Sequence, residues 1–98
     1  MKRFFENSLL VEVYDETRDG YRNVELRVME LNRRRPEVSS IRIKPEELNV
    51  YKPYVLQVIP ELVAWENVRK GKTKKGEDYS FINLNLDRIR LPERKTIS

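Results

Sequence analysis

The sequence predicts an all-β fold, namely a small antiparallel barrel of five strands with at most one short helical turn. Three observations support this prediction: apolar residues recur with a period near two, helical spacing is almost absent, and turn-forming residues separate the apolar runs. A chain of 98 residues is expected to form one domain, residues 1–98. Such a domain buries only roughly 60 to 65% of the surface that its unfolded chain exposes.

The first two expected strands form a hairpin. Residues 8–14 alternate between two faces, with Leu9, Val11 and Val13 on one of them. Residues 21–31 alternate in the same way and place three apolar side chains on one face: Val24, Leu26 and Val28. The polar segment between them, residues 15–20, has the composition of a turn. Two alternating runs joined by a short turn predict an antiparallel pair.

The third expected strand is short and is followed by the helical turn. Pro36 and three adjacent arginines interrupt the alternation after residue 31, and residues 38–44 resume it with Ile41 and Ile43 inward. Residues 45–48 begin with proline and contain two acidic residues, which suits the first turn of a helix.

The last two strands are expected over residues 54–67 and 78–91. Pro60 interrupts the first of these and requires an edge position or a bulge. In the second, Ile82, Leu84 and Leu86 share one face, but the apolar residues Ile89 and Leu91 then fall on the other. A bulge near Asp87 would return both to the core and leave Arg88 and Arg90 outside. Five strands of this kind are typical of OB-type and SH3-like barrels.

Composition excludes several classes of function. The chain contains no cysteine and no histidine, so disulfides, thiolate metal sites and imidazole catalysis are not available. We therefore expect a protein that is not an enzyme and has no cofactor and no metal site. No apolar run approaches the length of a membrane span, and the beginning of the sequence does not resemble a signal peptide. The expected location is the cytoplasm, or the host cytoplasm if the protein is viral.

The net charge of +4 is concentrated in the last third of the chain. Residues 1–66 hold 11 basic and 12 acidic residues, whereas residues 67–98 hold nine basic and four acidic ones. Five cations follow one another without an acidic residue between them: Arg69, Lys70, Lys72, Lys74 and Lys75. Tyr79 and Phe81 come next, on the outward face of the last strand. Cations that neutralise phosphates beside aromatic rings that stack on bases are the requirements for binding single-stranded nucleic acid.

Other interpretations of these residues remain open. A basic hairpin tip also protects a sheet edge while remaining solvated, and Tyr79 and Phe81 would equally pack against a loop or a second subunit. Arg18, Tyr21 and Arg22 form a weaker basic and aromatic group at the first hairpin. Trp65 is expected to anchor the core rather than to bind a ligand.

Several short segments resemble the single-stranded DNA-binding protein of filamentous bacteriophages, the gene V type. They are IRIK at residues 41–44, YKPY at 51–54, PELV at 60–63 and DRIRL at 87–91, and their order agrees with that family over residues 38–95. The segment TRDG at 17–20 resembles the start of the family's DNA-binding loop. One feature departs from the family pattern: its Gly-Lys-Pro-Tyr-Ser element lies in the first loop, whereas the comparable GEDYS, residues 76–80, lies here in the last hairpin.

The resemblance implies an OB-like barrel that dimerises and cooperatively coats single-stranded viral or plasmid DNA during replication, sometimes also repressing translation through mRNA. It further implies that Arg18 and Arg22 contact the DNA backbone, that Arg42 and Arg88 match basic residues of the family, and that residues 68–79 reach across the dimer.

The resulting hypothesis is a homodimeric protein that binds single-stranded DNA, or RNA, with little sequence preference. Two alternatives stay open: a protein-interaction or assembly module, and a binder of RNA or duplex DNA such as a translational repressor. The candidate binding residues are Arg18, Tyr21, Arg22, Arg42, Arg69, Lys70, Lys72, Lys74, Lys75, Tyr79, Phe81, Arg88 and Arg90.

Overall fold

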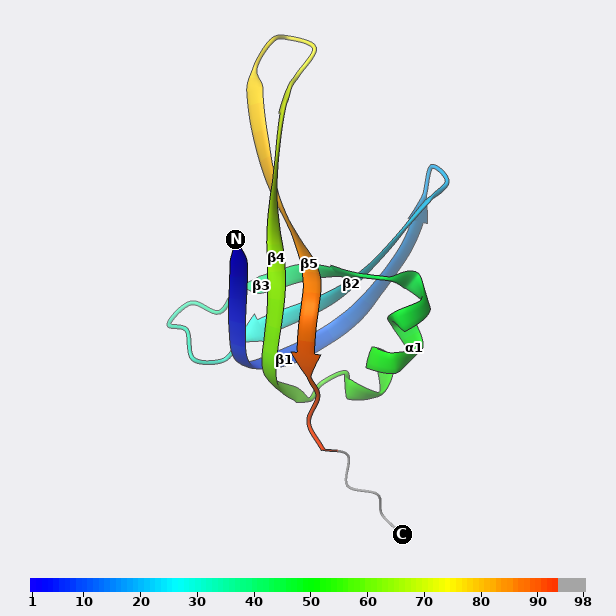
Figure 1. Cartoon of the computed structure of the whole chain (residues 1–98), viewed down its shortest axis with the longest axis vertical. Helices are drawn as coiled ribbons and strands as arrows, with labels where there is room; N and C mark the ends of the chain where they lie inside the picture. The colour runs from blue at the N-terminus through cyan, green and yellow to red at the C-terminus, as the bar shows by residue number, and fades with distance from the viewer. Residues whose placement is uncertain (94–98) are drawn as a thin grey trace.

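Five strands close into a barrel in the computed structural model, which describes residues 1–93 (Figure 1). The order around the barrel is β1-β2-β3-β5-β4. Its elements are β1 (Lys2–Arg18), β2 (Tyr21–Glu30), β3 (Val38–Ile43), η1 (Pro45–Glu47), α1 (Leu48–Tyr51), η2 (Lys52–Tyr54), β4 (Val58–Lys72) and β5 (Asp78–Arg90). The predicted OB-like, five-stranded fold is confirmed, although the β3–β5 pair is parallel rather than antiparallel. No helix within residues 1–93 is long and apolar enough to cross a membrane.

The barrel interior contains the side chains that the alternation predicted. Val24, Leu26 and Val28 of β2 are buried, as are Ile41 and Ile43 of β3. Leu48 and Tyr51 of α1 belong to the same core. A further set of buried residues completes this core: Phe5, Leu10, Ile59, Leu62, Ala64 and Leu84.

The strand β1 is longer than predicted because it bends instead of ending. Its first part pairs with β4 and its second part with β2. Asn7 has a positive φ of 47°, and the register with β2 shifts between Leu10 and Glu12, which marks a bulge. The predicted turn over residues 15–20 was too long: only Asp19 and Gly20 lie between β1 and β2.

The strand β4 begins at Val58 instead of residue 54, because residues 45–54 form three consecutive short helical segments. The predicted bulge in β5 is confirmed. Val63 pairs with Arg88 and Ala64 pairs with Leu86, so that Asp87 is the extra residue. Beyond this bulge, Ile89 and Leu91 pack against the core.

The prediction for Ile82 was wrong. It was expected to face the core with Leu84, but its side chain is 63% exposed, whereas Leu84 is buried. The reason is that β4 and β5 continue past the barrel as a two-stranded ribbon, in which neither face is covered (Figure 1).

Candidate nucleic-acid interface

Two hairpins project beyond the barrel toward the same end (Figure 1). The first hairpin joins β1 and β2 through Asp19 and Gly20, whose φ angles of 52° and 79° are those of a type I′ turn. The second hairpin is the ribbon of β4 and β5. At its tip, the Thr73 backbone N–H donates to the Glu77 carbonyl at 2.8 Å, and Gly76 adopts a φ of 82°. Both tips are therefore defined turns that hold the strand ends in register.

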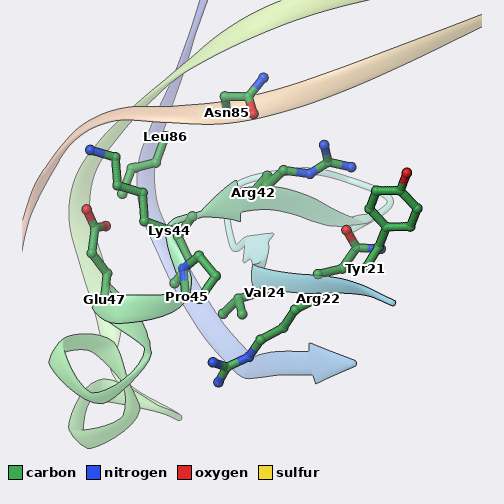
Figure 2. Close-up of a pocket in the computed structure, with 11 residues that line it drawn as sticks. Tyr21, Arg22, Val24, Arg42, Lys44, Pro45, Glu47, Asn85 and Leu86 are labelled. Carbon is green, nitrogen blue, oxygen red and sulfur yellow. The ribbon is translucent and has the colours of Figure 1, made fainter. Parts of the chain in front are cut away.

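A groove lies between the bases of these hairpins. It consists of two hollows of about 470 and about 520 Å³ that share Tyr21, Asn23 and Arg42. Arg18 and Arg69 line the second hollow, so residues from both hairpins meet here. Figure 2 shows Arg42 of β3 extending toward Tyr21 of β2, with Asn85 of β5 on the other side of the groove.

Strand pairing explains why residues so distant in sequence share this face. Successive side chains alternate between the two faces of a strand, and directly paired residues lie on the same face. Arg42 pairs with Asn85 across β3 and β5, and both therefore point outward. On β5, Asn83 and Phe81 lie two and four residues before Asn85 and therefore face the same way. Phe81 pairs with Arg69 of β4. The groove thus continues onto one face of the second hairpin.

The charges in the groove are largely available to a ligand. Arg18, Arg42 and Arg69 form no ion pair with any residue of the described range 1–93. Arg22 differs, because its Nε and Nη2 atoms donate to the two carboxylate oxygens of Asp15, each at 3.0 Å. This bidentate pair lowers the pKa of Asp15 and raises the pKa of Arg22.

The groove also has an acidic component. Asp19 and Glu47 line its two hollows, one in each. Within residues 1–93, no group of three or more His, Cys, Asp or Glu side chains is placed to hold a metal ion. The groove therefore combines arginine, lysine, amide and aromatic side chains with one carboxylate in each hollow.

Both hairpins carry exposed aromatic rings. Tyr21 is 76% exposed beside the groove. Farther up the second hairpin, the Tyr79 and Phe81 rings form a tilted pair with centroids 4.9 Å apart. Tyr79 lies across Gly71, its direct partner, so closely that a Cβ atom at that position would collide with its hydroxyl group. The glycine thus lets the Tyr79 ring lie flat against the hairpin.

Several candidate residues lie outside the groove. Lys70 and Lys72 occupy the opposite face of the second hairpin, because they alternate with Arg69 and Gly71. Lys74 and Lys75 lie in its tip. Arg88 and Arg90 line a separate depression of about 210 Å³ with Glu61, and Arg88 Nη2 lies 3.8 Å from Glu61 Oε1.

Sequence reasoning missed five polar or charged residues that line the groove: Asp19, Asn23, Lys44, Glu47 and Asn85. Alternation alone places Asn23 and Asn85 outward. The missing information was the parallel pairing of β3 with β5, which brings Asn85 beside Arg42.

The fold is similar to that of solved structures from yeast. Two crystal structures of Rim1, described as a mitochondrial single-stranded DNA-binding protein of S. cerevisiae, superpose with TM-scores of 0.65 and 0.64. In each comparison the identity is 15%, and 93% of both chains is covered. No protein-family model matches the sequence, and no curated protein is significantly similar to it. The resemblance to the gene V type family therefore stays a prediction.

Proposed function

We propose that this protein binds single-stranded DNA in the groove between its two hairpins. Arg18, Arg42 and Arg69 neutralise backbone phosphates, and bases stack on Tyr21 and on the pair of Tyr79 and Phe81. The observation that supports this most strongly is the convergence of three arginines without ion pairs, from three separate strands, beside an exposed tyrosine. OB-folds bind oligonucleotides on the face formed by strands β2 and β3, between the β1–β2 loop and the β4–β5 loop.

The structural neighbours support the same interpretation, because both are described as single-stranded DNA-binding proteins. Aromatic stacking accepts every base, so sequence preference is expected to be slight, and single-stranded RNA would fit the same groove. The lysines at positions 70, 72, 74 and 75 add a positive field that attracts the strand to the second hairpin.

The wider role follows from the resemblance in sequence. We propose that residues 1–98 act as one non-enzymatic domain, that two copies form a homodimer, and that the protein coats single-stranded DNA during viral or plasmid replication in the cytoplasm. Arg22 contributes to binding only after its pair with Asp15 opens, and we place Arg88 and Arg90 outside the strand path through the groove.

Fluorescence anisotropy of a labelled dT8 oligonucleotide tests the proposal. The wild-type protein is expected to bind dT8 and to prefer it over a labelled duplex of the same length. Tyr21→Ala is expected to weaken binding of dT8 by about 5- to 150-fold, the loss of one stacked base. Leu31→Ala is a matched control, because Leu31 is also exposed, at 46%, but lies outside the groove. Equal affinity for duplex and dT8, or no binding of either, would contradict the proposal.

A further inference from the structure

The prediction that Trp65 anchors the core was wrong. Its side chain is 43% exposed and lies on the outer face of β4. Leu62 and Ala64, which precede it on this strand, point into the core, and the second hairpin begins after it. It is the one tryptophan of the 98-residue sequence. A single exposed apolar side chain is ordinary at a protein surface, so the residues around Trp65 decide what it can do.

The pairing of the strands makes Trp65 a neighbour of the groove. Arg42 pairs with Asn85, Asn85 pairs with Trp65, and Trp65 pairs with Lys2. These four residues form one outward row across β3, β5, β4 and β1. Because adjacent strands lie about 4.8 Å apart, the backbones of Arg42 and Trp65 are separated by only about 10 Å. A nucleic-acid strand that leaves the groove across β5 would reach Trp65 next.

The contacts of Trp65 fix the orientation of its ring. The indole N–H donates to Asp87 Oδ1 at 3.1 Å, and the Lys2 ammonium lies 4.9 Å from the ring centroid. Lys2 Nζ is also 3.4 Å from Asp87 Oδ2, so the carboxylate is compensated by a cation and by a hydrogen bond. The Lys2 side chain is 43% exposed and is held by this surface pair and by its contact with the Trp65 ring, both of which are weak when exposed to solvent.

A second exposed aromatic ring shares this face. Phe4 is 60% exposed and lies two residues from Lys2 on β1, paired with Val63. Val63 faces outward as well, yet it is completely buried, which shows that neighbouring side chains cover it. Trp65 and Phe4 are therefore the exposed aromatic side chains around the buried Val63, and Lys2 is a nearby cation.

We propose that Trp65, together with Phe4, is a second base-stacking site, reached by a strand that crosses β5 from the groove. This inference rests on the proposed function and extends it to a longer strand. A base stacks on the Trp65 ring after Lys2 moves aside, and the freed ammonium pairs with the adjoining phosphate. The site takes single-stranded nucleic acid long enough to fill the groove and to extend past Asn85.

The emission of Trp65 provides a direct test, because no other tryptophan contributes to the signal. The wild-type protein is titrated with labelled oligonucleotides from dT4 to dT16, a range of about 4 to 16 nucleotides that covers the site sizes of single OB-folds. Anisotropy reports binding, and tryptophan emission with iodide accessibility reports stacking at Trp65. We expect the shortest oligonucleotides that bind to leave the emission unchanged, and longer ones to quench it and to protect it from iodide.

Substitutions separate stacking from a change in folding. Trp65→Ala is expected to weaken the longest oligonucleotide by about 5- to 150-fold while leaving the shortest one unaffected. Trp65→Phe, which keeps an aromatic ring, is expected to restore most of this loss. Val68→Ala is the matched control, because Val68 is also on β4 and 57% exposed, but faces the other side of the second hairpin.

Two negative outcomes have different meanings. If no oligonucleotide binds at any length, the proposed function itself is wrong. If the oligonucleotides bind but Trp65 is neither quenched nor protected at any length, and Trp65→Ala behaves as Val68→Ala does, the second stacking site is refuted while the groove stands.

Discussion

Replacing Arg42 with alanine tests whether the groove binds phosphate by direct contact. On single strands the logarithm of affinity falls with the logarithm of salt concentration by about 0.7 for each neutralised phosphate. An oligonucleotide whose phosphates pair only with the three groove arginines that have no ion pair, Arg18, Arg42 and Arg69, is therefore predicted to have a slope of about −2.1. Raising the salt from about 50 to about 200 mM should then weaken binding about 18-fold.

The alternative assignment gives a clearly different value. If the four lysines of the second hairpin contacted the same strand, the slope would approach −4.9, and the same change of salt would weaken binding about 900-fold. Arg42→Ala should reduce the slope of the groove complex from about −2.1 to about −1.4. The assay is anisotropy of labelled dT8 at five salt concentrations.

Arg90→Ala is the control that isolates position from charge. It removes the same formal charge from β5, but Arg90 lines the depression beside Glu61 instead of the groove. We expect its slope for dT8 to match that of the wild type. Equal reductions in the slope for Arg42→Ala and Arg90→Ala would show that only net charge matters, and the groove assignment would then be wrong.

Three further predictions concern the aromatic pair, acid stability and the core. Gly71→Ala should displace Tyr79 and weaken binding of long oligonucleotides, with Val68→Ala, at an exposed uncharged position on the opposite face of the same hairpin, as the control, and unchanged binding would show that the Tyr79 ring is not a stacking surface. Because the pair with Arg22 lowers the pKa of Asp15 below its ordinary value of 3.8, it stabilises the fold above that pH and loses this effect as the pH falls through the lowered pKa. The thermal midpoint of Asp15→Asn should therefore lie below that of the wild type at pH 7, and the two should converge as the pH falls through the lowered pKa of Asp15; a difference that does not change with pH would refute the linkage. Leu26→Ala, at a fully buried position, should destabilise the barrel by about 2–5 kcal/mol in urea unfolding, and a loss below about 1 kcal/mol would contradict its assignment to the core.

The sequence predicts most of the barrel because its strands alternate in a simple way. The change of parity between Leu86 and Ile89 predicted the bulge at Asp87, since only an extra residue returns Ile89 to the core. The length of β1 could not be predicted in the same way. Its bend depends on Asn7 and on the bulge after Leu10, where the alternation fails locally although the hydrogen-bonded pairing continues. The exposure of Trp65 could not be predicted either, because an apolar indole favours a core position and the residue type alone does not show which face of the strand it occupies.

The groove shows what the pattern of charge along the chain leaves out. In the sequence, the basic residues after residue 67 form one continuous cluster. Strand alternation divides this cluster, because Arg69 faces the groove while Lys70 and Lys72 face the opposite side of the same ribbon. The other groove arginines, Arg18 and Arg42, come from the part of the chain that has no surplus of positive charge. They meet Arg69 only because β3 pairs with β5 and closes the barrel. The capacity to follow a phosphate backbone therefore comes from the topology, which selects one residue of the basic run and adds two that the charge distribution alone would not have chosen.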